Sequence, residues 1–538
     1  MVSIQVSKEF LLRETGATEK ELLEALPQVK AGVEENGELL TLEVTGDRPD
    51  LLGRYGVARA LKGYFGKETG LAQFKLAKSK TKLTVEASVK KVRPFALAAF
   101  ARGLRFDDES VRELMQLQEK LVLTHGRRRR KVAVGVHDAA TVRGDLVYKA
   151  VGADFEFTPL GWDRPAPISK IMKEHEKGRE YAFCLNGRDY PLFCDEEGVL
   201  SMPPIINSQR TAVSMQTKDL LLDVTGTDWE ACNVALNILC HEFAAAGAKI
   251  EAIESDGRLA PETKPHEMLL SLDGVNKLLG VAFKPAEAVK CLRKQRLDAT
   301  EKNGVLACLT PRYRADFLHP VDLIEEIALG HGYNSFKPKQ PSMFTKGSVC
   351  VETLQEDKAR DALASAGFVE ALSRVLCNED AAFKALSETR FVKIKNPISK
   401  EYGSLRGELL PSLLGLLSAN THNPYPQRVF EAGEVVVRGG KEGTQTKRHA
   451  CAVACHSAAS LTEAAAALRH LLESLGVADY ALHPCGENRF MKGRQARVMI
   501  DGKAIGVIGE VHPQVLENFG LQMPCVAFEV RLDELPYA

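Results

Sequence analysis

Residues 311–334, PRYRADFLHPVDLIEEIALGHGYN, are the stretch from which the fold of this chain is best inferred. Pro320 suits the first turn of a helix, where its missing N–H would have no partner in any case. Apolar side chains follow at helical spacing, at Leu323, Ile324, Ile327 and Ala328. Gly330 comes directly after them as a stop signal. The pattern therefore predicts a helix that begins at Pro320 and ends at Gly330.

Four carboxylates belong to this stretch. Asp322, Glu325 and Glu326 have i, i+3 and i+4 spacing, which places them together on a helix surface. Asp316 can join them from the preceding extended segment. Such a group of hard oxygen ligands suits Mg²⁺. The alternative is that acidic residues in a first helical turn complement the helix dipole, and spacing alone leaves both interpretations open.

The chain contains a second copy of this pattern. Residues 45–62, TGDRPDLLGRYGVARALK, can be laid over it with Asp50 on Asp316, and a helix-like segment precedes each copy, at 21–26 and 287–292. The apolar positions coincide, but Gly56, Arg59 and Ala60 stand where the other copy has Asp322, Glu325 and Glu326. We therefore expect these carboxylates to serve a site, and their removal to leave the fold intact.

Length and composition limit the class of protein. A chain of 538 residues predicts about three to five domains. Its 71 basic residues balance 71 acidic ones, so any nucleic acid must be bound locally. The 12 cysteines include no C-x-x-C pair, which indicates a reducing compartment. With no export signal and no run near the ~18 apolar residues of a membrane helix, we expect a cytoplasmic protein without membrane partners.

Two basic stretches have competing interpretations. Lys75–Lys82 is expected to be a solvated joint after the first repeat copy. Arg127–Arg130 are four consecutive arginines before a strand-like segment. They could bind phosphates, but a short basic run is also typical of a solvated turn.

The densest polar stretch is residues 203–228, PPIINSQRTAVSMQTKDLLLDVTGTD. Two aliphatic, strand-like segments are flanked there by hydroxyls, amides and carboxylates, as in a pocket that recognises a small polar ligand through hydrogen bonds. The alternative for Asp223–Asp228 is a turn and helix cap before Trp229, because Ser, Thr and Asp favour such positions for local reasons. Further along, Asp501-Gly502 between two aliphatic segments predicts a hairpin.

Several motifs, spread nearly end to end and in the same order, resemble the beta chain of phenylalanyl-tRNA synthetase in the short form of archaea and the eukaryotic cytosol. They are residues 47–52 (DRPDLL), 130–138 (RKVAVGVHD), 203–208 (PPIINS), 223–228 (DVTGTD), 314–326 (RADFLHPVDLIEE), 396–399 (NPIS), 405–411 (LRGELLP) and 509–513 (GEVHP).

This resemblance implies an α2β2 assembly whose alpha chain binds ATP and phenylalanine and carries the adenylation site. It implies a Mg²⁺ site shared between chains and held by Asp316, Asp322, Glu325 and Glu326. It also implies an editing domain, at about residues 90–255, that hydrolyses tRNA mischarged with tyrosine. The expected editing pocket comprises Asn207, Ser208, Thr217, Asp223, Thr225 and Asp228.

The expected fold is α+β and multidomain. Residues 1–82 and 264–338 would form two related small helical or winged modules, the second with the metal site. Residues 83–258 would form an α/β editing-type domain, and 345–538 a degenerate, antiparallel-sheet domain like the catalytic domain of class II synthetases.

We expect no adenylation by this chain itself. A class II site holds its triphosphate with arginines of its second and third motifs. The corresponding stretches here, 428–436 and 505–512, contain Glu431, Glu434 and Glu510, and the latter stretch has no arginine. Two alternatives remain, a non-enzymatic interaction scaffold and a free-standing deacylase that edits in trans.

Overall fold

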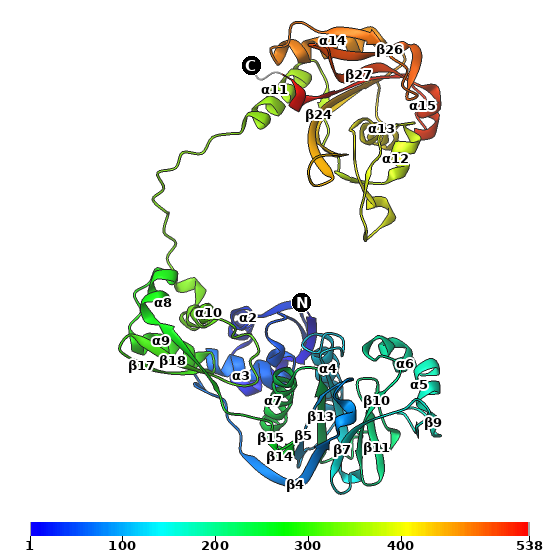
Figure 1. Cartoon of the computed structure of the whole chain (residues 1–538). Helices are drawn as coiled ribbons and strands as arrows, with labels where there is room; N and C mark the ends of the chain where they lie inside the picture. Colours follow the sequence, from blue (N-terminus) through cyan, green and yellow to red (C-terminus); the bar gives the residue numbers. More distant parts are fainter. Residues whose placement is uncertain (1, 536–538) are drawn as a thin grey trace. The chain divides into compact units, whose positions relative to one another are not determined.

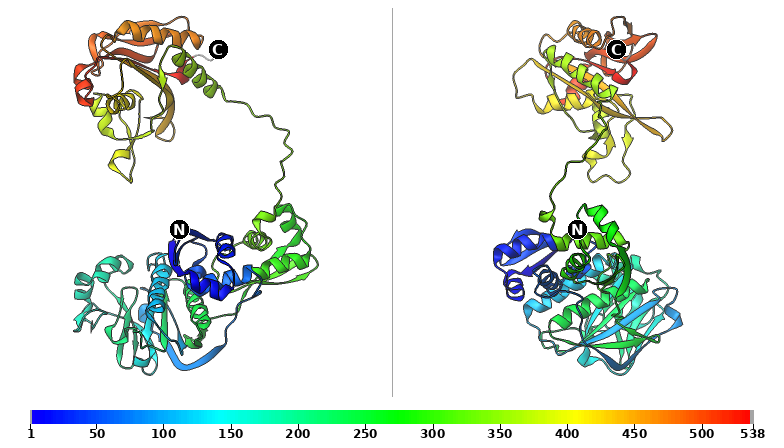
Figure 2. Two further views of the ribbon diagram at one scale, coloured as in Figure 1. Left: turned by 180° about the vertical axis from the view of Figure 1, so that it is seen from behind. Right: turned by 90° about the vertical axis from the view of Figure 1, so that its left-hand side faces the viewer.

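The computed structural model describes residues 2–535. The chain divides into two compact units, with the boundary in the sequence between Gln340 and Pro341. Residues 336–350 contain neither helix nor strand (Figure 1 and Figure 2). Within the described residues, no helix is both long and apolar enough to cross a membrane.

The first module opens the first unit. Its elements are β1 (Val2–Ser7), α1 (Lys8–Thr15), α2 (Glu19–Ala25), β2 (Ala31–Asn36), β3 (Leu39–Val44) and α3 (Arg54–Tyr64). The strands form an antiparallel sheet in the order β1-β3-β2. Ser7 caps the N-terminus of α1, and Gly16 ends it in the left-handed conformation.

A second module near the end of the unit has the same element order. It consists of β16 (His266–Ser271), α8 (Leu272–Leu279), α9 (Pro285–Lys294), β17 (Asp298–Lys302), β18 (Val305–Thr310) and α10 (Pro320–His331). Its sheet order, β16-β18-β17, matches that of the first module. The caps also match, with Ser271 before α8 and a left-handed Gly280 after it. This agrees with the internal repeat inferred from the sequence.

A ten-stranded sheet lies between the two modules in the sequence. Its strands are β4 (Leu76–Val85), β5 (Phe95–Arg102), β6 (Val132–Asp138), β7 (Leu146–Val151), β10 (Tyr190–Asp195), β11 (Gly198–Met202), β12 (Ile206–Asn207), β13 (Leu220–Gly226), β14 (Lys249–Ser255) and β15 (Arg258–Ala260). The order is β12-β11-β10-β7-β4-β14-β5-β13-β6, with β15 paired to β14. The accompanying elements are α4 (Asp108–Leu123), α5 (Ile168–Glu174), α6 (Glu176–Tyr181), α7 (Trp229–Ala245) and the ribbon β8 (Glu156–Phe157) and β9 (Ala166–Pro167).

The two faces of the central strands have separate cores. Leu220, Leu222 and Val224 of β13 pack with α7 into one core, whereas Leu221 packs into another. This alternation is the period of two expected of a strand. It places Asp223 on the face opposite α7.

The lysine-rich segment 75–82 corrects an expectation. Its residues are mostly exposed, as expected of a solvated segment, but they do not form a joint, because residues 76–85 form β4, which pairs in parallel with β14 and β7. Lysine is depleted in strands, but the pairing of residues 76–83 with β14 outweighs that local preference. β4 also crosses the boundary expected at residue 82.

The second unit is built on a seven-stranded sheet, ordered β19-β23-β24-β28-β27-β26-β25. Its strands are β19 (Val369–Glu370), β23 (Gln427–Arg438), β24 (Thr444–Cys455), β25 (Ala481–Pro484), β26 (Phe490–Ile500), β27 (Lys503–Val511) and β28 (Cys525–Arg531), beside a small sheet of β20 (Leu376–Cys377), β21 (Val392–Lys393) and β22 (Ser404–Leu405). The helices are α11 (Val351–Ser365), α12 (Glu379–Lys384), α13 (Leu410–Ala419), α14 (Leu461–Ser474) and α15 (Pro513–Phe519). The hairpin expected at Asp501-Gly502 joins β26 to β27, with positive φ at both turn residues, and is confirmed.

Candidate functional site

Two of the four carboxylates expected at a metal meet on a buried arginine instead. Arg314 Nε lies 2.8 Å from Asp316 Oδ1, and its Nη2 lies 2.6 Å from Asp316 Oδ2 and 2.7 Å from Glu326 Oε1. The side chains of Arg314 and Glu326 are each 1% exposed. Burial alone would lower the pKa of Arg314, but Glu326 and Asp316 outweigh it and hold that pKa well above its usual range. Arg314, Asp316 and Glu326 therefore form a buried ion-pair cluster.

The other two carboxylates have different partners. Asp322 Oδ2 accepts hydrogen bonds from the backbone N–H groups of Leu318 and His319, both at 2.7 Å. Glu325 Oε1 lies 3.2 Å from Lys30 Nζ of the first module. Within residues 2–535, no group of three or more His, Cys, Asp or Glu side chains is placed to hold a metal ion. The donor set of this chain alone does not fit Mg²⁺, and a site shared with a partner chain stays a prediction.

The Arg314–Asp316 ion pair has an equivalent in the first copy of the repeat. Arg48 binds Asp50 in the first module just as Arg314 binds Asp316, with distances of 2.8 and 2.9 Å. The two pairs also act on one another, since Arg314 and Asp316 contribute to the electrostatics of Arg48. Burial would raise the pKa of Asp50, but Arg48 and then Arg314 lower it to about 2. The buried pair of Arg314 with Glu326 is part of the fold, so we now expect Glu326 to contribute to folding, which differs from the expectation drawn from the repeat.

A cavity of about 480 Å³ lies in the ten-stranded part of the first unit. Of the six residues expected in an editing pocket, it is lined by Asn207 of β12 and Asp223 of β13. The remaining lining residues are Met115, Gln118, Glu119 and Val122 of α4; Arg129; Ala133, Val134 and Gly135 of β6; Leu160; His175, Glu176 and Lys177 at the start of α6; and Ser201, Pro203, Pro204, Ile205 and Ile206.

Asp223 is the buried acidic group of this cavity, only 1% exposed. Its Oδ2 accepts a hydrogen bond from Ser201 Oγ at 2.8 Å and lies 2.8 Å from His137 Nε2. A carboxylate only accepts, so Nε2 of His137 carries the shared proton. A Cβ at Gly135, the cross-strand neighbour, would come within 2.4 Å of the same Oδ2. Glycine there leaves room for the carboxylate.

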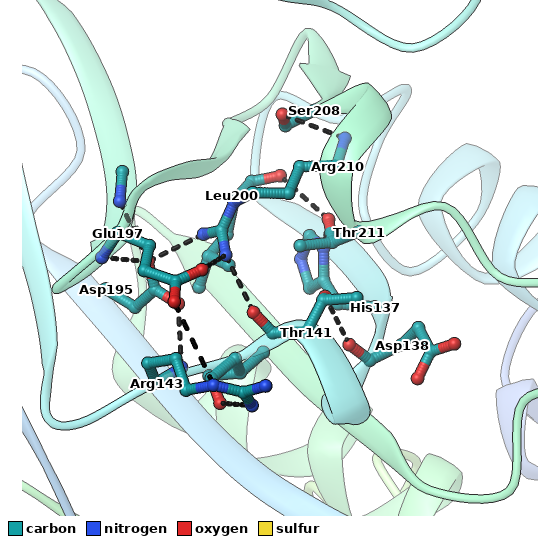
Figure 3. Close-up of polar contacts among 12 residues, drawn as sticks. His137, Asp138, Thr141, Arg143, Asp195, Glu197, Leu200, Ser208, Arg210 and Thr211 are labelled. Atoms are coloured by element: carbon teal, nitrogen blue, oxygen red, sulfur yellow. Dashed lines mark hydrogen bonds and ion pairs between the residues drawn. The ribbon is translucent and has the colours of Figure 1, made fainter.

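A polar network behind the cavity fixes His137. Its Nδ1 lies 2.8 Å from Oγ1 of Thr211, in the short 3-10 helix Gln209–Thr211. The neighbouring Arg210 donates to Asp195 at 2.6 Å and to the carbonyl of Thr141 at 2.7 Å. Figure 3 shows Arg210 directed at Asp195, and Thr211 beside His137. The loop is therefore anchored to β10, and it orients the histidine that holds Asp223.

The other four expected pocket residues do not line the cavity. Ser208 donates to the carbonyl of Thr158, and Thr217 donates to Asp138. Thr225 accepts from Nε of the buried Arg93 at 3.0 Å.

Asp228 caps α7 through the N–H of Ala231, a hydrogen bond that lowers the pKa of the carboxyl, and it also pairs with Lys131. The turn-and-cap alternative therefore describes Asp228 correctly, while Asp223 belongs to the cavity.

Sequence reasoning missed Ser201 and His137. Strand periodicity places His137 and Gly135 on one face of β6, but nothing in the sequence gives the register that pairs Gly135 with Asp223.

In the second unit, two of the three expected glutamates, Glu431 and Glu510, have arginine partners, and Glu434 is exposed. Glu431 is fully buried and lies 2.7 Å from Arg406 Nη1. Glu510 lies 2.9 Å from Arg494 Nη1. Arg428 opens the stretch 428–436, which corresponds to the second class II motif and lies in β23. Its Nε lies 2.8 Å from Glu463 of α14. These stretches therefore carry carboxylates, and Arg406, Arg428 and Arg494 already have acidic partners.

Comparison with protein-family models gives three matches along the chain. The B3/4 domain matches residues 83–236, the tRNA synthetase B5 domain residues 268–333, and the phenylalanyl tRNA synthetase beta chain CLM domain residues 339–532. The cavity lies within the first of these, the Arg314 cluster within the second. Together they define a multidomain chain of the aminoacyl-tRNA synthetase class.

Curated relatives narrow this class. A phenylalanine–tRNA ligase beta subunit of Archaeoglobus fulgidus is 38% identical over 534 residues, covering 97% of this chain and 96% of its own. The beta subunit of Pyrococcus horikoshii is 36% identical, covering 93% and 92%. A solved N-terminal fragment of the Pyrococcus horikoshii beta subunit is 34% identical, covers 62% of this chain and all of its own, and gives a TM-score of 0.59. The chain belongs to the phenylalanine–tRNA ligase beta subunit family, which confirms the resemblance seen in its motifs.

Proposed function

We propose that this chain is the beta subunit of a cytoplasmic phenylalanine–tRNA ligase and is non-catalytic for adenylation. It would assemble with an alpha chain into an α2β2 tetramer that charges tRNA with phenylalanine at the expense of ATP. Its cavity around Asp223 would hydrolyse tyrosyl-tRNA made in error. The observation that carries the second part is a buried carboxylate, held in place by Ser201 and His137, in the wall of a cavity within the B3/4 match.

The cavity chemistry suits discrimination between tyrosine and phenylalanine. The two amino acids differ by one hydroxyl, and a site selects for it by presenting a polar partner. The described hydrogen bonds of Asp223 both end on Oδ2, so Oδ1 remains an acceptor for an incoming hydroxyl. A hydrogen bond to a charged group contributes about 1.5–3 kcal/mol, and phenylalanine cannot form it.

The hydrolysis itself needs a water molecule and donors for the ester oxygen. Gln118, His175 and Lys177 are among the N–H-bearing side chains that line the same cavity, and each would have to exchange a present partner, Val134, Leu160 or Glu180, to supply them. Pro203, Pro204 and Ile205 give the cavity an apolar wall that suits an aromatic ring. We infer that the ring lies against this wall with its hydroxyl toward Asp223.

Adenylation would belong to the alpha chain. The ion pairs of Glu431, Arg428 and Glu510 support this, because a nucleotide site needs unpaired cations facing the phosphates. The test is co-expression with an alpha chain, followed by phenylalanine charging and ATP–pyrophosphate exchange. We expect a tetramer active in both assays and no exchange by this chain alone. Exchange by the isolated chain, or failure to assemble, would contradict the proposal.

A further inference from the structure

The turn between α4 and β6 has an unusual backbone for its sequence. Arg127, Arg128 and Arg129 all have positive φ, at 49°, 54° and 66°. Glycine or asparagine adopts this left-handed conformation more readily than arginine does. The turn is nevertheless well defined, because the N–H groups of Arg128 and Arg129 donate to the carbonyls of Leu123 and Val122. Local folding preference therefore does not explain why arginines occupy it.

Arg129 ties this turn to the cavity. Its Nη1 donates to the carbonyls of Pro204 and Ile205 at 2.9 and 2.8 Å, and both of these residues line the cavity. Its guanidinium also lies 3.9 Å from the ring centre of Tyr181, at the end of α6. Arg129 is thus a structural anchor that holds the turn at the cavity wall.

The other arginines of the turn are directed to solvent around an aromatic ring. The guanidinium groups of Arg128 and Arg130 lie 5.4 and 4.7 Å from the ring centre of Phe183, which is 42% exposed. Arg127 is exposed as well. Within residues 2–535, no carboxylate forms an ion pair with Arg127, Arg128 or Arg130. Free cations beside an exposed ring form a surface suited to a flexible polyanion with aromatic groups.

We propose that Arg127, Arg128, Arg130 and Phe183, here called the arginine platform, bind the single-stranded 3′ end of tRNA. Guanidinium groups bind phosphates in a bidentate manner, and an exposed aromatic ring stacks on an unpaired base. α6 begins at the cavity and ends two residues before Phe183, so this helix runs from the cavity to the platform. The inference rests on the proposed editing function, which requires the esterified end of a tRNA to reach this cavity.

The test measures RNA binding separately from hydrolysis, on the assembled α2β2 complex. The probe is a 5′-labelled single-stranded RNA with the sequence of a tRNA 3′ end, followed by fluorescence anisotropy. For Arg128→Gln/Arg130→Gln we expect at least tenfold weaker binding. The slope of log affinity against log salt should also fall by about 1.4, since each lost phosphate contact on a single strand removes about 0.7. Phe183→Ala should weaken binding about fivefold or more through lost stacking.

The matched control is Lys75→Gln/Lys80→Gln, which removes the same charge from exposed positions at and near β4. It should change RNA affinity less than twofold. Unchanged affinity in the arginine variant, or an equal loss in the lysine variant, would overturn the platform. Equal displacement of the RNA by a glutamate-rich peptide of the same charge would also overturn it, since an acidic protein segment would then be the better ligand.

Measuring tyrosyl-tRNA hydrolysis distinguishes failure of the editing function from failure of the arginine platform. If wild-type complex binds the RNA through the platform but leaves tyrosyl-tRNA intact, the editing function fails and the platform stands. If it hydrolyses tyrosyl-tRNA and the arginine variant does so with unchanged kcat/KM, the editing function stands and the platform fails.

Discussion

Replacing Glu326 with alanine should destabilise the second module, although the family resemblance implies a metal-binding role for that residue. Glu326 is buried, and its Oε1 lies 2.7 Å from Nη2 of the buried Arg314. Removing one partner of a buried ion pair costs about 3–5 kcal/mol, because the other charge is left without compensation. Asp316 would still bind Arg314 through two contacts, so we expect a loss near the lower limit, about 3 kcal/mol.

The control is Glu325→Ala, which removes the same charge one position earlier. Glu325 is 46% exposed and pairs with Lys30 at 3.2 Å. An ion pair this exposed contributes about 0–1 kcal/mol. The two variants therefore separate a structural carboxylate from a surface one.

Hydrogen exchange of the α10 amides in the full chain measures the difference. A loss of about 3 kcal/mol accelerates exchange through unfolding roughly 150-fold, since each 1.4 kcal/mol is a factor of ten. Glu325→Ala should change exchange less than about fivefold. Equal rates in both variants would refute the structural role of Glu326 and favour the view that these carboxylates serve a site shared with another chain.

Three further predictions concern Asp50, Gly135 and the binding of Mg²⁺. Asp50→Asn should lose about 2 kcal/mol of stability at neutral pH, because a pKa held at about 2 instead of 3.8 stabilises the fold above pH 4. This advantage disappears as the pH falls toward 2, so urea unfolding curves of variant and wild type that differ equally at every pH would contradict it. Gly135→Ala should displace Asp223 and lower tyrosyl-tRNA hydrolysis at least tenfold while phenylalanine charging is kept; unaltered deacylation would argue against the cavity. The thermal midpoint of the isolated chain should be the same in Mg²⁺ and in EDTA, whereas a reproducible rise with Mg²⁺ would reveal a site that its own residues complete.

The sequence predicts the start of helix α10 correctly but not its end. Its start at Pro320 follows from the sequence, but it ends at His331, before Gly332, and not at Gly330. A Cβ at Gly330 would lie 2.3 Å from the carbonyl oxygen of Cys291 in α9. The glycine is required for close packing of two helices, a long-range reason that no local stop signal can distinguish from helix termination.

Long-range contacts also limit what the sequence predicts about the Arg314 cluster and the cavity around Asp223. The repeat can be recognised in the sequence because apolar spacing survives in both copies. The roles of Arg48 and Arg314 cannot, because a carboxylate cluster favours a metal site over a buried arginine until the burial is known. Asp223 was expected in the pocket, whereas Ser201 and His137 come from other strands, and their approach to it depends on strand order and register.

The most direct test of the editing site is single-turnover hydrolysis of tyrosyl-tRNA by the α2β2 complex carrying Asp223→Asn, with Asp228→Asn as the matched control. Asparagine keeps the size of both side chains, and it also caps helices well at position 228. We expect Asp223→Asn to slow hydrolysis at least tenfold, Asp228→Asn to retain the wild-type rate, and both to charge tRNA with phenylalanine normally. Hydrolysis at the wild-type rate in Asp223→Asn, or an equal loss in both variants, would contradict the assignment of the cavity around Asp223 as the editing site.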